Sequence, residues 1–203
     1  MTDAHSILPL AILEAMRSLD SPSDEEVAEY VDELLRKRLG LSETVAAQIV
    51  RYEAVVRRDG RVPAAELEQI LRLAGRRTDA ALVFADGGRR AARRAVGRTS
   101  WPTRWMARYL PRPIRRMIGF RAARGAAREV FGAALARQGG AARAALEPGG
   151  GGAHVRATPD GAACAFYAAA FAELLRHLMD FEGAMVHERC RNRGDAHCEW
   201  RPT

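Results

Sequence analysis

The periodicity of the apolar residues changes once along this 203-residue chain, and that change most constrains its fold. Up to about residue 138 the apolar side chains recur mainly at helical spacing. Short strand-like segments then follow at 142–147 and 153–158, on either side of the glycine loop 148–152. One more helical segment and a terminal pair of strands complete the pattern. This order predicts a helix-rich α+β fold with a small antiparallel sheet of about four strands.

Start and stop signals divide the helical region. Ser42 is placed to cap one helix, while Gly87-Gly88 is expected to interrupt another and Pro111 and Pro113 to break a third. The expected helical segments are 6–18, 23–39, one from Ser42, 63–75, 78–96, pieces of 101–124, and 125–138.

The C-terminal region is expected to hold a buried helix over 163–181 and a hairpin of 183–190 and 196–202. We divide the chain into a helical part, 1–100, and a ligand-binding part, 101–203, within one compact domain. An apolar content of 48% is sufficient for a core in a domain of this size.

The three cysteines, Cys164, Cys190 and Cys198, and the nearby His187 suit a metal site. Three thiolates and one imidazole make a closed tetrahedral zinc site, whose role is structural because no position is left for a substrate. An odd number of cysteines argues against a closed set of disulfides. In a regular strand His187 faces away from Cys190, so the fourth ligand is His187 if the strand bulges and Glu188 otherwise. The alternative is that the cysteines are ordinary core residues.

The C-terminal spacing of Cys190 and Cys198 around Gly194-Asp195, with Cys164 one helix upstream, resembles that of the vinyl-4-reductase domain family. Upstream stretches resemble the family's bacteriochlorophyll-biosynthesis branch; they are 5–16, 60–85, 110–140 and 164–179. The resemblance implies a compact, often dimeric fold around a four-stranded sheet, similar to the lipid-holding subunits of transport complexes. It also implies an apolar pocket for hydrocarbons, aromatics or tetrapyrrole intermediates, and the branch implies reduction of the 8-vinyl group of a chlorophyllide.

The residues themselves favour binding over catalysis, because the sequence has no dinucleotide-binding glycine motif and no recognisable catalytic arrangement. We therefore expect a zinc-stabilised carrier of an apolar, acid-bearing molecule, such as a tetrapyrrole precursor of bacteriochlorophyll. The alternatives are an 8-vinyl reductase and a sensor of small hydrophobic ligands. The alanines of the 163–181 helix leave room either for a ligand or for a close helix contact. The expected pocket residues are Phe120, Phe131, Phe166, Tyr167, Ala170, Phe171 and Leu174.

An arginine-rich tract runs from Arg89 to Arg128 without a single acidic residue, which indicates an anionic partner. That partner is a ligand carboxylate or an anionic membrane surface, and the absence of a recognisable helix-turn-helix argues against nucleic acid. Trp101, Trp105 and Tyr109 fall on one helical face, as an interfacial helix requires; the alternative is that they form the core stripe of a buried helix. The expected contact residues are Arg104, Arg108, Arg112, Arg115 and Arg116.

The sequence also bears on location and partners. The N-terminus lacks the basic region of a secretory signal, and no run approaches the ~18 apolar residues of a membrane span. These features predict a cytoplasmic protein, with peripheral contact at the inner membrane as the alternative. Its expected partners are the hydrophobic ligand and either a second copy of the chain or a biosynthetic enzyme.

Overall fold

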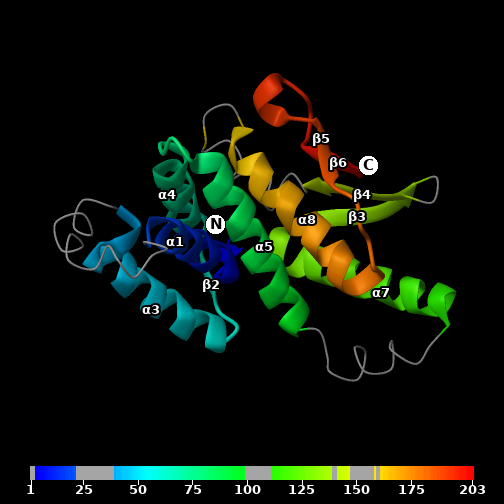
Figure 1. Cartoon of the computed structure of the whole chain (residues 1–203), viewed down its shortest axis with the longest axis horizontal. Coiled ribbons are helices and arrows are strands. Elements are labelled where there is room, and N and C mark those ends of the chain that lie inside the picture. The colour runs from blue at the N-terminus through cyan, green and yellow to red at the C-terminus, as the bar shows by residue number, and fades with distance from the viewer. Residues whose placement is uncertain (1–2, 22–38, 99–110, 139–140, 147–157, 159–160) are drawn as a thin grey trace.

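The computed structural model describes residues 3–21, 39–98, 111–138, 141–146, 158 and 161–203. The predicted fold class is confirmed: the protein is a helix-rich α+β domain with one small antiparallel sheet (Figure 1). The helices are α1 (Ile7–Asp20), η2 (Leu39–Leu41), α3 (Glu43–Arg57), α4 (Ala64–Gly75), α5 (Ala80–Arg98), α7 (Arg112–Phe131), α8 (Ala163–Met179) and η5 (Arg191–Arg193). The strands are β1 (Asp3–His5), β2 (Arg61–Pro63), β3 (Ala133–Gln138), β4 (Ala141–Leu146), β5 (Met185–Arg189) and β6 (Glu199–Pro202).

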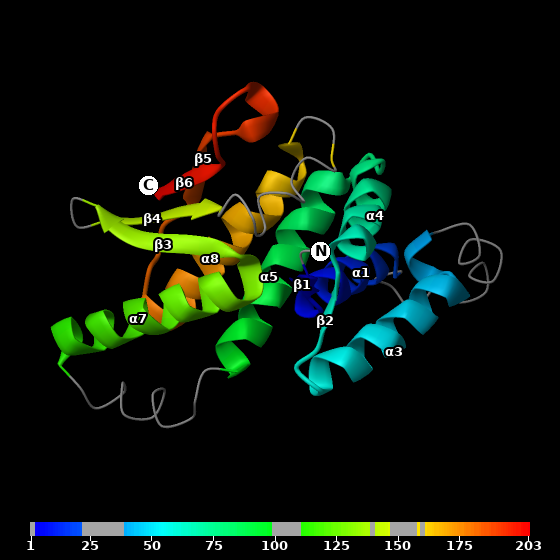
Figure 2. The same ribbon diagram turned by 180° about the vertical axis from the view of Figure 1, so that it is seen from behind.

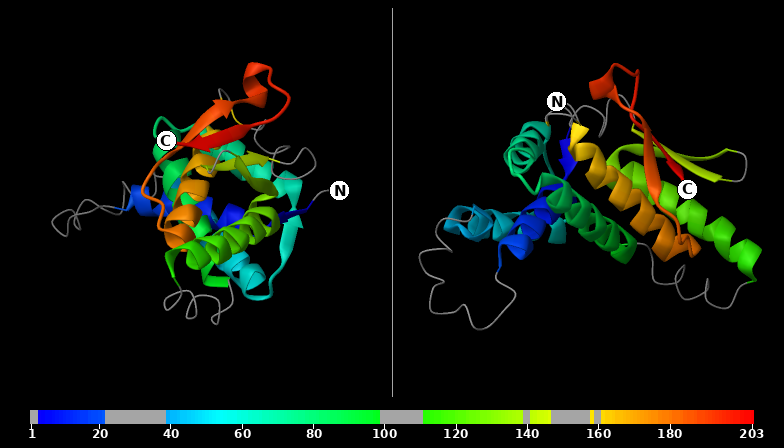
Figure 3. Two further views of the ribbon diagram at one scale, coloured as in Figure 1. Left: turned by 90° about the vertical axis from the view of Figure 1, so that its right-hand side faces the viewer. Right: turned by 45° about the horizontal axis from the view of Figure 1, so that its top comes forward.

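The four-stranded sheet has the order β3-β4-β6-β5, and all its strand pairs are antiparallel. The expected C-terminal hairpin is therefore present as β5 and β6, while β1 and β2 form a separate pair. Helix α5 runs through the middle of the molecule. Helices α1, α3 and α4 lie on one side of α5, and α8, α7 and the sheet lie on the other (Figures 1 and 2). Helix α8 lies between α5 and the hairpin (Figure 3, right).

Helix α5 passes through Gly87-Gly88 without interruption, so the predicted break there is wrong. The reason is a close approach of helices. A Cβ on Gly88 would lie 2.1 Å from the Phe166 carbonyl oxygen and 3.1 Å from the Ala170 nitrogen. A Cβ on Gly87 would lie 3.3 Å from the Cα of Ile12 on α1. The two glycines thus let α1 and α8 reach the backbone of α5.

Replacing Gly88 with alanine is expected to lower the free energy of unfolding by about 1–3 kcal/mol, because the new methyl group would overlap the backbone of α8. Gly97 is the matched control on the same helix, since a Cβ there meets nothing within 4 Å. Gly97→Ala should instead stabilise the protein by up to ~1 kcal/mol through helix propensity. Urea unfolding of both variants checks this, and an equal response of the two would contradict the close contact.

The structure also corrects the predicted end of the helix over 125–138. Helix α7 ends at Phe131, and Gly132 adopts the left-handed conformation (φ +59°) that commonly follows a helix. Strand β3 then pairs with β4 along its whole length, from Ala133 opposite Leu146 onward. Alanine-rich residues 133–138 suit a helix by propensity, so pairing with β4 overrides the local preference.

The remaining predictions of elements have mixed outcomes. The cap at Ser42 is confirmed, since its Oγ accepts a hydrogen bond from the Val45 amide at 3.3 Å. Pro111 is the residue directly before α7. Pro113 lies within the first turn of α7 and does not break the helix, because the amides of the first turn have no partner within the helix. The predicted helix over 23–39 and the strand over 153–158 lie almost wholly outside the described residues.

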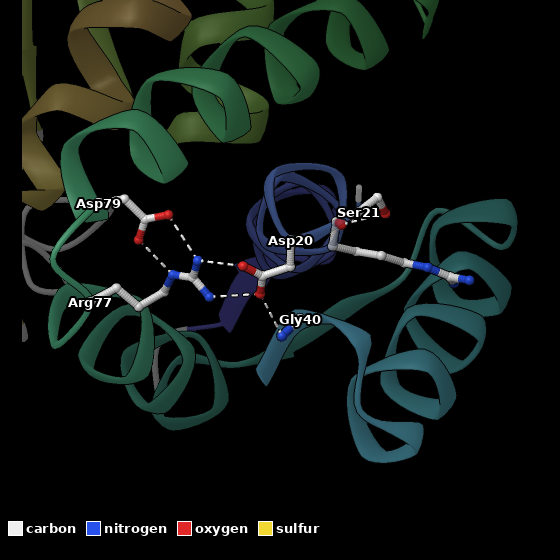
Figure 4. Close-up of polar contacts among 6 residues, drawn as sticks. Asp20, Ser21, Gly40, Arg77 and Asp79 are labelled. Carbon is white, nitrogen blue, oxygen red and sulfur yellow. Dashed lines mark hydrogen bonds and ion pairs between the residues drawn. The ribbon is translucent and has the colours of Figure 1, made fainter. Parts of the chain in front are cut away.

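A partly buried ion cluster closes the C-terminal end of α1 (Figure 4). The Arg77 guanidinium donates to both oxygens of Asp20 at 2.7 and 2.8 Å, and to Asp79 at 2.7 and 2.8 Å. Asp20 also accepts from the Gly40 amide at 2.8 Å. Arg77 therefore connects α1 to the turn between α4 and α5, and Asp20 connects α1 to η2.

Candidate metal centre

Three elements bring the candidate metal ligands together. Cys164 is the second residue of α8, whose first turn is capped by Thr158: its Oγ1 accepts from the Ala163 amide at 3.0 Å. His187 lies on β5, Cys190 follows β5 directly, and Cys198 precedes β6. All three cysteines are free thiols and buried. The cluster therefore joins the start of a helix to the closed end of a hairpin.

The distances within this cluster suit a tetrahedral ion. The Cys164 sulfur lies 3.9 Å from that of Cys190 and 4.0 Å from that of Cys198. Zn–S bonds near 2.3 Å place sulfurs about 3.8 Å apart at the corners of a tetrahedron. The ligand atoms of the three cysteines and His187 all lie within 4.8 Å of one another. A Cys3His cluster within metal-binding distance is thus present.

A bulge in β5 decides which residue faces the cluster. The register with β6 shifts between His187, which is opposite Trp200, and Arg189, which is opposite Glu199. His187 stacks on the Trp200 ring with centroids 4.9 Å apart, and its Nε2 is buried without a hydrogen-bond partner among the described residues. An unpaired buried nitrogen is costly unless a metal or proton acceptor satisfies it. The donor set therefore fits a metal ion.

Glu188, the alternative ligand, faces away from the cluster. Its carboxylate lies 3.5 Å from Arg143 and 3.6 Å from Arg201, and the side chain is partly exposed. The structure accordingly brings His187, and not Glu188, to the three sulfurs.

The loop between Cys190 and Cys198 is held by its own hydrogen bonds. The Cys190 carbonyl accepts from the amides of Arg193 (2.9 Å) and Asp195 (3.1 Å), while the Asp195 carboxylate accepts from the Cys190 amide at 2.7 Å. Gly194 supplies the left-handed conformation (φ +98°) that this turn needs. The Arg191 amide donates to the Cys198 sulfur at 3.4 Å. These contacts hold both sulfurs in place and explain the Gly-Asp turn.

The surroundings of the thiols favour one thiolate. The pKa of Cys198 is lowered because the Cys164 thiol, His187 and the Arg191 amide all stabilise its sulfur as an anion. The pKa of Cys164 is raised by its hydrogen bond with Cys198 and by burial. A thiolate is the form that binds a metal, so the cluster holds a ligand prepared for one.

Most of the predicted pocket residues lie together in the core. The rings of Phe131, Phe166, Tyr167 and Phe171 contact one another with centroids 5.4–6.5 Å apart. Ala170 lies at the α5–α8 contact described above, and Leu174 is also buried. Phe120 is separate and lies under the Arg137 guanidinium, 4.6 Å from its centre.

Sequence reasoning missed Trp200, which is fully buried between His187 and the aromatic cluster (its ring is 5.4 Å from Phe171). It thereby connects the metal centre to the core. In the short strand β6, Trp200 lies between the more exposed Glu199 and Arg201. This alternation of polar and apolar residues could have predicted that Trp200 is buried.

An open groove of about 1220 Å³ lies at the opposite end of α8. Arginines and apolar side chains from the start of α7, the sheet and the end of α8 line it. The cationic members are Arg112, Arg115, Arg116 and Arg137, and the apolar ones include Leu175, Met179 and Phe181. The predicted anion-binding residues Arg112, Arg115 and Arg116 therefore share one groove. Arg104 and Arg108, like Trp101, Trp105 and Tyr109, lie outside the described residues.

Part of the arginine tract has a structural role instead. Arg94 donates to Glu14 at 2.5 Å, Arg93 to Glu173 at 2.9 Å, and Arg90 to Asp86 at 2.6 Å. Acids on other helices thus pair with Arg93 and Arg94, and an acid of α5 itself pairs with Arg90. The absence of acidic residues between Arg89 and Arg128 therefore overstates the unpaired positive charge of this tract, because some of its arginines form ion pairs with acids on other helices.

Comparison of the chain with protein-family profiles, with curated proteins and with solved structures finds no match. Each helix in the described ranges is too short or too polar to cross a membrane.

Proposed function

We propose that this protein is a zinc-stabilised binding protein, or carrier, for an apolar small molecule that bears a carboxylate. The groove at the end of α8 carries this proposal, because it combines apolar side chains with four arginines. Its volume of about 1220 Å³ leaves room for a large ligand, since pockets for drug-sized molecules measure roughly 300–1,000 Å³.

Zinc would be held by Cys164, His187, Cys190 and Cys198, and it would supply a structural crosslink without an open coordination position. Its location connects it to the groove. Helix α8 begins at the cluster and ends at Met179 in the groove, and β6 follows the cluster and ends at Pro202 in the groove. Fixing the near ends of α8 and β6 thus positions two walls of the groove.

A tetrapyrrole intermediate of bacteriochlorophyll biosynthesis has the chemistry that the groove suits. Its macrocycle is a large apolar surface, and its propionate is a carboxylate for an arginine. The resemblance of the cysteine spacing to the vinyl-4-reductase domain family supports this choice of ligand. Presentation of the pigment requires only binding, for which a groove of this kind is sufficient.

Fluorescence titration with pheophorbide, a metal-free chlorin carboxylate, tests this proposal on the full-length, zinc-loaded chain. Met179→Asp places a charge among the apolar groove residues and is expected to weaken binding about tenfold or more, equivalent to at least ~1.4 kcal/mol. Met117→Asp is the control, since Met117 is 60% exposed on α7 outside the groove. No uptake of pheophorbide by the wild-type protein would refute a tetrapyrrole as the ligand of this groove.

A further inference from the structure

One arginine of the groove differs from the others in its partners. Arg115 donates from Nη2 to the Asp180 carboxylate at 2.5 Å, whereas its Nε is buried and has no hydrogen-bond partner among the described residues. Asp180 itself is mostly exposed, at 63% of its side chain. Nη2 of this guanidinium is therefore paired with an exposed carboxylate, while the neighbouring Nε is buried and has no partner among the described residues.

From this arrangement we infer that Arg115 is the anchor for a carboxylate of the ligand, and that Asp180 occupies this anchor until the ligand displaces it. The inference rests on the proposed carrier function and names the group that the groove recognises. An incoming carboxylate replaces that of Asp180 at Nη2 with a charge-assisted hydrogen bond, and it would reach Nε, to complete the bidentate geometry that arginine offers, once the atoms that cover Nε move. Asp180 leaves toward solvent at little cost, because an exposed ion pair contributes little stability.

The fold holds Arg115 at this place through a close helix contact. A Cβ on Gly119 would lie only 1.8 Å from the Leu178 carbonyl oxygen, so α7 and the last turn of α8 touch through their backbones there. Arg115 lies one turn before Gly119 on the same face of α7, which places it beside Asp180. Asp180 ends α8 in the left-handed conformation, with φ +54°. The anchor and its internal competitor are therefore set by the crossing of two rigid helices.

The charges around the anchor favour an external anion over Asp180. Arg112 and Arg116 line the same groove and have no acidic partner in the described part of the chain. Arg137 donates to the Arg116 carbonyl at 3.3 Å and lies over the Phe120 ring, and among the described residues it has no carboxylate partner either. Asp180 and Glu182 are the acidic side chains lining the groove. The lining side chains include four guanidiniums and two carboxylates, and Thr203, which carries the terminal carboxylate of this chain, also lines the groove. The balance of charge still favours a ligand acid.

The decisive experiment compares pheophorbide with its methyl ester, which keeps the macrocycle but lacks the negative charge. Wild-type protein is expected to bind the acid about tenfold or more tightly than the ester, and high salt should reduce that preference. Arg115→Gln should bring the two affinities close together. Arg121→Gln, on the same helix but outside the groove, should leave the preference unchanged.

Asp180→Asn isolates the displacement step. Asparagine tolerates the left-handed conformation, so α8 should end as before, while the competing charge is gone. Affinity for the acid should rise about twofold to fivefold, the range that corresponds to an exposed ion pair, and affinity for the ester should stay the same. Thermal unfolding of each variant checks that it is folded.

The outcomes separate this inference from the proposed function. Equal binding of acid and ester by the wild-type protein would overturn the anchor and leave the carrier function intact. The same holds if Asp180→Asn weakens binding of the acid. If a fatty acid binds with the same dependence on Arg115 while the chlorin does not, the carboxylate anchor stands and the tetrapyrrole is the wrong ligand. Binding of none of these probes would refute the carrier function and, with it, the anchor.

Discussion

Replacing Cys198 with serine is expected to remove zinc from the protein and to lower its melting temperature by about 8–16 °C. The Cys198 sulfur is fully buried and accepts a hydrogen bond from the Arg191 amide. The hydroxyl of a serine at this position would therefore be buried away from water. Zinc present at roughly 1,000 times its dissociation constant stabilises the folded state by about 4 kcal/mol. Each kcal/mol shifts the melting temperature of a domain of roughly 150–250 residues by about 2–4 °C.

Metal analysis and calorimetry of the zinc-loaded chain measure this effect, and a chelator should produce the same shift in the wild-type protein. His197→Ala is the matched control, because His197 is next to Cys198 but lies 3.6 Å from Glu199 instead of in the cluster. Freshly purified wild-type protein with far less than one zinc per chain would contradict a zinc site. Equal losses in the two variants would show that the cluster contributes no more than an ordinary neighbour.

Replacing Arg77 with methionine should lower the free energy of unfolding by about 3–5 kcal/mol, since it leaves a buried carboxylate without its partner. The Asp20 side chain is only 7% exposed, and Arg77 provides two of its hydrogen bonds (Figure 4). Arg72→Met is the control. Arg72 is 60% exposed and lies 3.7 Å from Glu68, so its loss should change stability by less than about 0.5 kcal/mol. Denaturant unfolding near neutral pH gives both values.

The same cluster predicts a dependence on pH. The Arg77 guanidinium lowers the pKa of Asp20 and of Asp79 below their ordinary values. A carboxyl with a lowered pKa in the folded state stabilises the protein above its unfolded pKa, near ~4, and this contribution is lost as the pH falls through the folded pKa. Wild-type stability should therefore fall below about pH 4. Arg77→Met should show a weaker fall, and an identical acid profile would contradict the role of Arg77.

The metal centre was largely predictable because its ligands are recognised by residue type and by their short spacing in the sequence. Three cysteines and a histidine near a Gly-Asp turn indicate a tetrahedral site in any fold that brings 164 close to 190 and 198. The choice between His187 and Glu188 depended on a bulge in β5. A bulge arises from pairing between strands, so periodicity within one strand does not reveal it.

The groove and its charges were less predictable, because they depend on contacts between segments far apart in the sequence. Arg115 and Asp180 are 65 residues apart, and their pairing follows from the crossing of α7 and α8 at Gly119. In the same tract, Arg93 and Arg94 pair with acids 80 residues away. A count of charges along the chain does not separate these two uses of arginine.

The sequence by itself determined the α+β class, the alternation of helices and terminal strands, and the donor set of the metal centre, since each follows from local periodicity or residue chemistry. Tertiary structure alone decided that 133–138 is a strand, that Gly87-Gly88 lies inside a continuous helix, and where the groove opens. Alanine favours a helix and glycine disfavours one, but each preference is only about 1 kcal/mol per residue or less, which tertiary contacts override. Strand pairing with β4 and backbone contact with α8 therefore determined the structure at these positions.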